Sequence, residues 1–211
     1  MAQPRSPVSE AYRQLRTNIQ FYSLDRAVQT VLVTSASPDD GKSTTLANLA
    51  VTFAETGRGV LAVDCDLRRP SLHTFFGLSN DVGLTTLIRE ERTVADVVVD
   101  TEVPNLRILP SGPLPPNPAE LLGSQRMERV IETLRGMADV ILFDSPPMIA
   151  VTDAAVLGAK MDGVLLVVSV NKTKRDHVSR AKRLLEKVNA KVLGVVLNNV
   201  KFDGSLYRYY G

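Results

Sequence analysis

The fold is decided by residues 29–50, which read QTVLVTSASPDDGKSTTLANLA. The β-branched run at 29–35 predicts a short strand, because Val and Thr side chains suit a pleated, buried surface. From Lys42 to about Thr56, apolar side chains recur on one face of a helix. The intervening ASPDDG contains Pro, Asp and Gly, which favour turns. This stretch therefore predicts a strand, a loop and a helix in direct succession.

The loop ends in Gly41-Lys42-Ser43-Thr44, the chemical core of a phosphate-binding loop, or P-loop. Gly41 lets the backbone approach a phosphate, and the first N–H groups of the helix point at the anion. Lys42 is long enough to reach the β- and γ-phosphates of a nucleotide, and the Ser43 hydroxyl is a natural Mg²⁺ ligand. The alternative is an ordinary exposed lysine at a helix start. We predict ATP and Mg²⁺ as cofactors, with nucleotide contacts from Asp40, Gly41, Lys42, Ser43, Thr44 and Thr45.

Two further strands end in aspartates. Asp64 closes the apolar run VLAVD, with Asp66 two residues later, and Asp144 closes VILFD. The carboxyl ends of parallel strands meet at one edge of a sheet, where ligands bind, and a carboxylate there holds Mg²⁺ directly or through water. The alternative is that Asp64 or Asp66 caps a helix or pairs with Arg68 or Arg69. We predict Lys42, Asp64, Asp66 and Asp144 as catalytic residues, and Ser43, Asp64 and Asp144 as metal ligands.

The rest of the chain alternates strands with helices. Further strands are predicted at 60–64, 106–110, 139–144, 163–170 and 191–198. Helices are predicted at 9–22, 83–90, 93–99, 119–136, 152–160 and 173–188. Ser9 is the predicted N-cap of the first, and Gly123 is expected to break the fourth. This alternation predicts an α/β fold of the P-loop NTPase type, with a mostly parallel central sheet and helices on both faces.

The composition limits the class of protein. The chain has 211 residues, 44% hydrophobic and 23% charged, which suits one globular domain. Its net charge of +2 argues against wholesale electrostatic binding of nucleic acid, which needs a strongly basic face. Cys65 is the only cysteine, so a reducing compartment fits. Without a signal peptide or a membrane-length apolar run, the expected location is cytoplasmic, with any membrane link supplied by a partner or a missing segment.

The loop departs from two familiar P-loop patterns. Ala36 stands where the usual consensus has its first glycine, and Ser37 stands where MinD/ParA-like ATPases carry a second lysine. The absence of that lysine counts against a ParA/MinD-like ATPase switch, which we keep as an alternative function.

With these residues assembled, the chain resembles the bacterial tyrosine kinases of capsule and exopolysaccharide biosynthesis, called BY-kinases. The resemblance runs from about Ser9 to the C-terminal end. Its most distinctive part is the proline-rich segment SGPLPPNP (111–118), which lies between the acidic motifs. The matching segments are SEAYRQLRTNI (9–19), TSASPDDGKST (34–44), VDCDLRRP (63–70), LPSGPLPPNPAELL (109–122), FDSPP (143–147) and GVVLNN (194–199), with a closing tyrosine cluster.

The resemblance implies an ATP-dependent tyrosine kinase that phosphorylates itself. Lys42 and Ser43 match the family's Walker A motif, Asp64 and Asp66 its Walker A′ motif, and Asp144 its Walker B aspartate. Asp64 is then expected to orient Mg²⁺ and the attacking tyrosine hydroxyl, or to act as its base. The implied organisation is a kinase domain at 1–199, with a flexible leader at 1–8 and an oligomerisation helix at 9–22, and a tyrosine-rich tail at 200–211.

The resemblance also implies assembly through a motif near the N-terminus. Glu10, Arg13 and Arg16 match the family's Glu-x-x-Arg-x-x-Arg motif, which packs subunits into a ring. From the residues alone, Glu10 and Arg13 are three apart on a helix and simply pair with each other.

The C-terminal tyrosines Tyr207, Tyr209 and Tyr210 are the expected phosphoacceptors, offered to a neighbouring subunit's active site. The alternative is a packed aromatic end. The implied partners are a homo-oligomer, a membrane-spanning polysaccharide co-polymerase or activator that is fused or separate, and other protein tyrosine substrates, but no nucleic acid. The implied location is the inner face of the plasma membrane.

Asp39 is the main departure from the family, which usually has glycine at this position. If the position needs a positive φ, a non-glycine residue costs about 1 kcal/mol or more. Its carboxylate would also lie near a polyphosphate, where it would weaken ATP binding. The alternative is that the Asp39 amide still serves the phosphates and its side chain faces water. This departure keeps a third alternative open, a degenerate scaffold without catalysis.

Three weaker signals remain. The basic segment 172–183 reads as a solvated helix face, or alternatively as a docking site for anionic tails or a membrane surface. Asn198 follows the last strand, where its amide is a candidate for hydrogen bonding adenine. His73 and His177 have no metal-like partners in the sequence and are interpreted as structural or surface residues.

Overall fold

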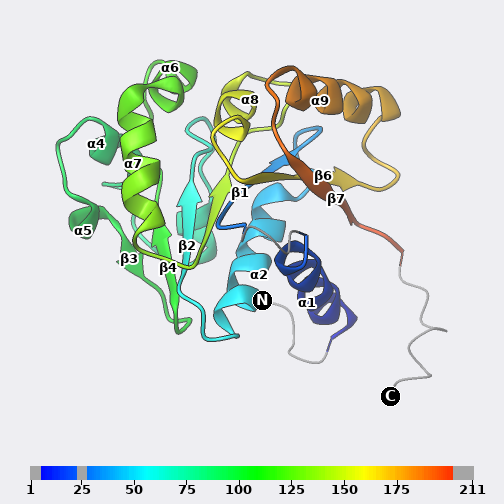
Figure 1. The fold of residues 1–211 in the computed structure, drawn as a ribbon, viewed down its shortest axis with the longest axis horizontal. Coiled ribbons are helices and arrows are strands. Elements are labelled where there is room, and N and C mark those ends of the chain that lie inside the picture. Colours follow the sequence, from blue (N-terminus) through cyan, green and yellow to red (C-terminus); the bar gives the residue numbers. More distant parts are fainter. Residues whose placement is uncertain (1–5, 23–27, 202–211) are drawn as a thin grey trace.

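The computed structural model describes residues 6–22 and 28–201, which form a seven-stranded sheet in the order β3-β4-β2-β5-β1-β6-β7 (Figure 1). All neighbouring strands are parallel except β3, which runs antiparallel to β4. The strands are β1 (Thr30–Ser35), β2 (Val60–Asp64), β3 (Val99–Asp100), β4 (Leu106–Leu109), β5 (Val140–Asp144), β6 (Gly163–Ser169) and β7 (Val192–Asn198). The predicted mostly parallel sheet is confirmed.

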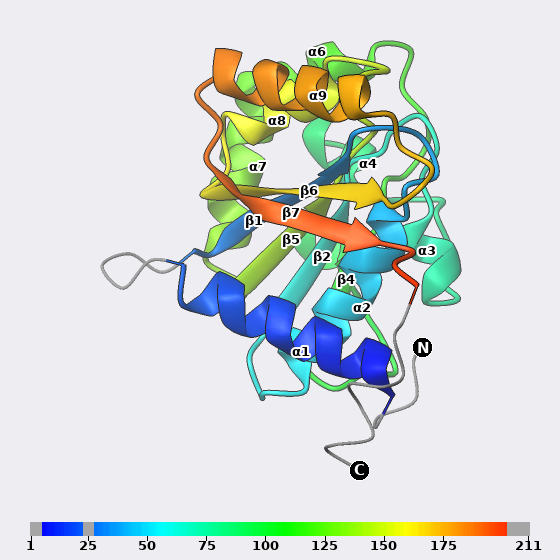
Figure 2. The same cartoon turned by 90° about the vertical axis from the view of Figure 1, so that its right-hand side faces the viewer.

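Helices cover both faces of the sheet. One face packs against α1 (Pro7–Gln20), α2 (Lys42–Ala54) and α3 (Leu72–Phe75). The other packs against α4 (Leu84–Ile88), α5 (Val94–Val97), α6 (Pro118–Gly123), α7 (Gln125–Arg135), α8 (Asp153–Gly158) and α9 (Arg175–Lys187). Figure 2 shows α9 and α1 on opposite faces of β6 and β7.

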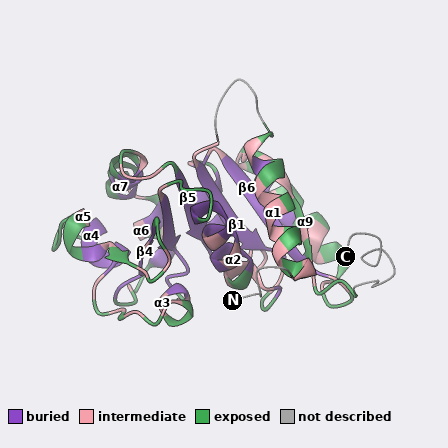
Figure 3. Ribbon diagram, turned by 90° about the horizontal axis from the view of Figure 1, so that it is seen from below, coloured by how far each residue is buried: buried purple, intermediate pink, exposed green. Residues whose placement is uncertain are grey.

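The central strands are apolar because they are covered on both faces. Every residue of β1, β2, β5 and β6 is buried, which is why their sequences read as continuous apolar runs instead of alternating ones. Figure 3 shows these strands in purple, between helices whose outer faces are exposed. Among the described residues, no helix is both long and apolar enough to cross a membrane.

The first helix starts earlier than predicted. Ser6, not Ser9, is the N-cap of α1, and its hydroxyl accepts a hydrogen bond from the Ser9 N–H at 3.1 Å, so the prediction of Ser9 as the cap was wrong. Pro7 favours this earlier start, because a proline in the first helical position has a suitable φ and no N–H to leave unpaired. The helix therefore includes two residues of the predicted leader.

The helix break predicted near Gly123 is confirmed, since α6 ends there and α7 begins at Gln125 with Ser124 as its N-cap. The remaining differences from the prediction concern short elements. The four-residue α3 and the two-residue β3 were not predicted. Elements this short carry too few residues to show a period in the sequence.

The strand order places the predicted site. In the register between β2 and β5, Asp64 lies beside Asp144, and Val33 of β1 is the neighbour of Asp144 on its other side. The loop that follows β1 is the P-loop. Three loops that are far apart in the sequence thus meet at the carboxyl edge of the sheet, where open α/β folds bind ligands.

Candidate active site

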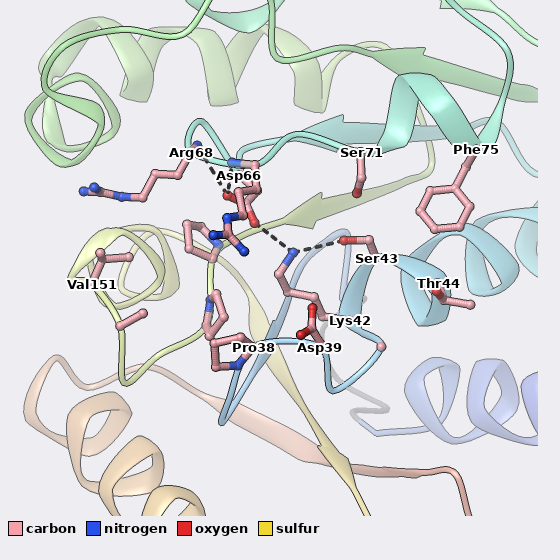
Figure 4. A pocket seen from close by; sticks show the side chains of 15 residues that line it. Pro38, Asp39, Lys42, Ser43, Thr44, Asp66, Arg68, Ser71, Phe75 and Val151 are labelled. Carbon is pink, nitrogen blue, oxygen red and sulfur yellow. Dashed lines mark hydrogen bonds and ion pairs between the residues drawn. The ribbon is translucent and has the colours of Figure 1, made fainter. Parts of the chain in front are cut away.

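A cavity of about 660 Å³ opens at this edge of the sheet. Figure 4 shows Pro38, Asp39, Lys42 and Ser43 along one side of it, and Arg68, Ser71 and Phe75 along the other. The lining residues are Pro38, Asp39, Gly41, Lys42, Ser43, Thr44, Asp66, Arg68, Arg69, Ser71, Phe75, Pro146, Pro147, Ala150 and Val151. Its size is that of a small-molecule site.

Lys42 is the cation at the polar centre of this cavity. Its Nζ lies 2.9 Å from Asp66 Oδ2 and 3.6 Å from Asp144 Oδ1, and it donates a hydrogen bond to Ser43 Oγ at 3.0 Å. Burial alone would lower the pKa of Lys42, but the charges of Asp144 and Asp66 more than offset this effect and raise it. The structure thus brings three other predicted site residues, Ser43, Asp66 and Asp144, around the Lys42 ammonium group.

Ser43 and Asp144 are the pair best suited to hold Mg²⁺. Ser43 Oγ donates to Asp144 Oδ2 at 2.5 Å, whereas Asp144 Oδ1 is buried and accepts no hydrogen bond from the described residues. A buried oxygen without a donor is unfavourable, and a cation would relieve it. In the described part of the chain no group of three or more His, Cys, Asp or Glu side chains could hold a metal ion. Mg²⁺ usually takes one or two carboxylates together with phosphates and waters.

Asp64 is buried below the cavity and does not line it. Its Oδ2 accepts the N–H groups of Ser71 and Leu72, both at 2.9 Å, and its Oδ1 accepts the N–H of Asp66 at 3.2 Å. This is the capping alternative considered from the sequence, here at the start of α3. Burial and the nearby charge of Asp144 raise the pKa of Asp64 to about 7. The metal contact predicted for Asp64 stays a prediction, and Asp66 is the aspartate of this pair that lines the cavity.

The carboxylate of Asp40 braces the P-loop from behind. It accepts hydrogen bonds from the Ser37 N–H at 2.9 Å and from the Thr173 hydroxyl at 2.6 Å. The Asn198 amide donates to the Asp40 carbonyl at 2.9 Å. A Cβ added to Gly41 would lie 2.1 Å from Asn198 Nδ2, which is too close for a non-bonded contact. The φ of Gly41 is 90°, a conformation that suits glycine, so only glycine fits at this position. The loop is therefore held by β7 and by the segment between β6 and α9.

Three of the predicted nucleotide contacts lie away from the cavity lining. Asp40 and Thr45 are buried, and the Thr45 N–H donates to the Gly41 carbonyl at 2.9 Å. Asn198 contacts the loop through its amide, as described above. Gly41 and Thr44 do line the cavity. The nucleotide contacts of Asp40, Thr45 and Asn198 stay predictions.

Asp39 adopts the backbone conformation that makes a side chain costly. Its φ is 58°, its side chain is exposed at the cavity, and its carbonyl accepts a hydrogen bond from Lys172 Nζ at 2.9 Å. The condition for strain stated from the sequence is therefore met, although Asp tolerates this region better than most residues.

Sequence reasoning missed three residues that support the site. The buried carboxylate of Asp153 holds the Arg68 guanidinium in two contacts of 2.9 and 3.1 Å. Thr173 bonds to Asp40, as above. His177 Nδ1 lies 2.8 Å from Ser37 Oγ. Each belongs to an element distant in sequence from its partner, and no motif in the sequence marks these pairs.

The residues of the motif near the N-terminus make contacts within the described chain. Arg13 pairs with Glu10 at 3.0 Å, as the local alternative expected, and both side chains remain partly exposed. Arg16 donates to the carbonyl of Thr52 in α2 at 2.9 Å. A role in subunit contacts stays a prediction. The predicted phosphoacceptors Tyr207, Tyr209 and Tyr210 lie outside the described residues.

Comparison with protein families matches residues 26–205 to the ParA family, described as NUBPL iron-transfer P-loop NTPase. The match covers both strands that end in site aspartates and the P-loop itself. It shows a P-loop NTPase of the ParA type, in agreement with the strand order and the cavity described above.

Similarity over the whole chain gives a narrower assignment. The chain is 45% identical to the tyrosine-protein kinase YwqD of Bacillus subtilis, over 100% of this chain and 90% of that relative. The solved structure of the chimerical protein CapA2B2 matches with a TM-score of 0.91 and 42% identity, over 95% of this chain and 88% of that one. The structure of the septum site-determining protein MinD of Pyrococcus horikoshii, complexed with Mg-ADP, matches less closely. Its TM-score is 0.69 and its identity is 26%, over 80% of this chain and 69% of that one. The chain belongs to the bacterial tyrosine kinases of capsule and exopolysaccharide biosynthesis, within the ParA type of P-loop NTPases.

Proposed function

We propose that this chain transfers the γ-phosphoryl group of MgATP to tyrosine hydroxyls, and that Tyr207, Tyr209 and Tyr210 of a neighbouring subunit are among its acceptors. The observation that carries the proposal is the convergence of Lys42, Ser43 and Asp66 on one cavity, with the buried carboxylate of Asp144 bonded to Ser43 and lying 3.6 Å from Lys42 Nζ. Phosphoryl transfer depends mainly on positioning and on stabilising the charge of the moving group, and this set of groups suits both tasks.

MgATP supplies the phosphoryl group, and the chain positions it. The N–H groups that open α2 and the Lys42 ammonium are available to the phosphates, while Ser43 Oγ and Asp144 are the ligands that the chain offers to Mg²⁺. In the absence of phosphates, Asp66 and Asp144 neutralise Lys42.

We assign the orientation of the acceptor hydroxyl to Asp66 in preference to Asp64. Asp66 lines the cavity, whereas both oxygens of Asp64 accept backbone hydrogen bonds inside the protein. A group that orients a hydroxyl or accepts its proton must come within hydrogen-bonding reach of it. Asp64 then acts indirectly, by fixing the segment that carries Asp66.

The resemblance extends the proposal to assembly. Glu10, Arg13 and Arg16 would contact a neighbouring subunit in a ring at the inner face of the plasma membrane, beside a membrane-spanning polysaccharide co-polymerase. Each phosphorylated tyrosine adds roughly −1.5 to −2 charges, and the repulsion between phosphorylated tails would disperse the ring. This cycle would regulate capsule or exopolysaccharide synthesis and export.

The test is to incubate the purified chain with MgATP and map phosphate by mass spectrometry. We expect phosphotyrosine at residues 207–210, lost in Lys42→Met and in the triple Tyr→Phe tail variant. The matched control is Lys182→Met, which removes an exposed lysine of α9 and should leave the reaction intact. Phosphotyrosine in Lys42→Met at the wild-type level would overturn the proposal.

Two alternatives predict different outcomes of the same experiment. A ParA/MinD-like ATPase switch is favoured by the family match and predicts ATP hydrolysis with unmodified tyrosines. A non-catalytic scaffold is favoured by the positive φ of Asp39 at the cavity and predicts no nucleotide binding in a titration with ATP.

A further inference from the structure

The side of the cavity opposite the P-loop carries cationic and apolar side chains that can contact a ligand. We call the segment from Arg68 to Phe75 the rim. Arg68, Arg69, Ser71 and Phe75 line the cavity from this segment, and Figure 4 shows Arg68, Ser71 and Phe75 along the side opposite Pro38 and Asp39. The rim begins two residues after Asp66, and both line the same cavity, so a ligand of the rim lies near the carboxylate assigned to the acceptor hydroxyl.

The two arginines of the rim are in different states. Arg68 is held in a two-contact ion pair by the buried carboxylate of Asp153, so its charge is largely neutralised within the protein. The Arg69 side chain is exposed at the cavity and forms no ion pair or hydrogen bond with any described residue. Only its backbone N–H is bonded, to Asp66 Oδ1 at 3.0 Å. Arg69 therefore offers a guanidinium whose five donors are available to a ligand.

The rest of this side suits an aromatic ring. Phe75 is a large apolar side chain that is 45% exposed, at the mouth of the cavity. Pro146, Pro147, Ala150 and Val151 add further apolar lining from the loop after β5. The phosphates of ATP gain nothing from such a surface, whereas the aromatic ring of a tyrosine gains from apolar contact and from packing against Phe75.

Building on the proposed function, we infer that the rim binds the segment that carries the acceptor tyrosine, and that Arg69 selects tyrosines with a negative charge beside them. A guanidinium pairs with a carboxylate or a phosphate through two parallel hydrogen bonds, so acidic residues and phosphotyrosine are both suitable neighbours. The tail reads LYRYY at 206–210, with Tyr209 and Tyr210 adjacent. The first phosphate added to this cluster would then favour the transfer of the next.

The test measures phosphoryl transfer to peptides by the full-length chain with Tyr207, Tyr209 and Tyr210 changed to Phe, so that the tail does not compete. The four peptides have the same acceptor tyrosine and differ only in the residues beside it. These are glutamates in the first peptide, glutamines in the second, lysines in the third and one phosphotyrosine in the fourth. We expect the KM of the glutamate and phosphotyrosine peptides to lie roughly five- to tenfold below that of the lysine peptide, since a charged hydrogen bond at a partly exposed site has about this effect.

Variants of Arg69 sharpen the result. Arg69→Ala should abolish the preference, Arg69→Lys should keep most of it, and Arg69→Glu should reverse it in favour of the lysine peptide. In each variant the change in the KM of the charged peptides should exceed any change in the KM of ATP or in the kcat for the glutamine peptide. Arg89→Ala is the matched control, because it removes an exposed arginine that does not line the cavity.

Phe75→Ala separates the two contributions of the rim. It should raise the KM of all four peptides by a similar factor and leave the charge preference intact. Binding of the phosphotyrosine peptide to Lys42→Met, measured by fluorescence anisotropy, provides a reading that does not depend on turnover.

The outcomes distinguish this inference from the proposed function. The role of Arg69 would be overturned if all four peptides were phosphorylated with the same KM, or if Arg69→Ala changed only the KM of ATP. Tyrosine phosphorylation itself would still stand. Failure to phosphorylate any peptide, together with an unmodified tail in the wild-type chain, would overturn the proposed function and this inference with it.

Discussion

Buried or partly buried aspartates lie at both ends of the sheet, and their surroundings differ. At the amino ends of β1 and β6, Asp162 accepts hydrogen bonds from the Gln29 and Thr30 N–H groups, from the Thr30 hydroxyl and from both terminal nitrogens of Arg135, all between 2.9 and 3.1 Å. At the carboxyl ends, Asp64, Asp66 and Asp144 share one nearby lysine, and one oxygen of Asp144 accepts no hydrogen bond from the described residues.

The pKa values follow this difference. Burial alone would raise the pKa of Asp162, but the hydrogen bonds from Arg135 and Thr30 lower it to about 2. Burial and the Asp144 charge raise the pKa of Asp64 to about 7. Aspartate thus stabilises the fold at one end of the sheet and leaves unbalanced negative charge at the other. The Mg²⁺ of the proposed function would offset this excess of negative charge.

The largest effect is expected for Asp144→Asn. Phosphoryl transfer should fall by about 10²- to 10³-fold, because a charged ligand for Mg²⁺ is lost. The free energy of unfolding of the nucleotide-free chain should rise, because a buried charge disfavoured by its surroundings is removed. Single-turnover transfer and urea denaturation measure the two effects. Activity within tenfold of the wild type would contradict the assignment.

Asp162, at the opposite end of the sheet, should respond in the opposite way. Asp162→Asn should lower the free energy of unfolding by about 2–3 kcal/mol, because Arg135 loses its charged partner and the Thr30 backbone loses a strong acceptor. Transfer activity should be unchanged at temperatures where the variant is folded. Urea denaturation checks this, with the exposed Asp100→Asn as control. An equal loss in the control would mean that the Asp162 contacts contribute nothing special.

The pH dependence of stability should also have opposite signs at the two ends. The raised pKa of Asp64 means that the folded chain binds a proton more tightly than the unfolded one, whose Asp pKa is about 3.9. The stability that this proton contributes to the folded chain is therefore complete below about pH 4 and is lost as the pH rises through about 7. The lowered pKa of Asp162 gives a contribution that is complete above about pH 4 and is lost as the pH falls through about 2.

Urea denaturation of the nucleotide-free chain between pH 5 and pH 8 separates the two effects. We expect stability to fall across this range in the wild type and to change much less in Asp64→Asn, while Asp162→Asn keeps the wild-type slope. A wild-type slope in Asp64→Asn would show that this carboxyl group does not titrate in the range.

The smallest effect concerns the P-loop backbone. Asp39→Gly should raise the free energy of unfolding by about 0.5–1 kcal/mol, because glycine adopts a φ of 58° without strain. It should also tighten ATP binding several-fold, because a carboxylate beside the polyphosphate is removed. Isothermal titration with MgATP and urea denaturation measure both quantities. Unchanged affinity would show that the carboxylate faces water and does not impair the site.

The strands and the P-loop were readable from the sequence because their signals are local. A parallel strand covered on both faces is a continuous apolar run, so the boundaries of β1, β2, β5 and β6 fall within one residue of those predicted. Gly41, Lys42 and Ser43 are adjacent, and their role follows from a strand, a loop and a helix in succession. The cap at Ser6 and the four-residue α3 depend on contacts that leave no periodic pattern.

The fold class, the phosphate loop and the set of aspartates near it follow from the order of the amino acids alone, because side-chain pattern and strand polarity dictate these features. Which aspartate lines the cavity depends instead on contacts in three dimensions. Asp64 and Asp66 are equivalent in the sequence, but the fold turns the chain back at Ser71 so that two N–H groups bind Asp64, and Asp66 meets Lys42. The fold likewise pairs Arg68 with Asp153 and leaves Arg69 at the cavity, because contacts between distant segments arise only once the sheet has brought those segments together.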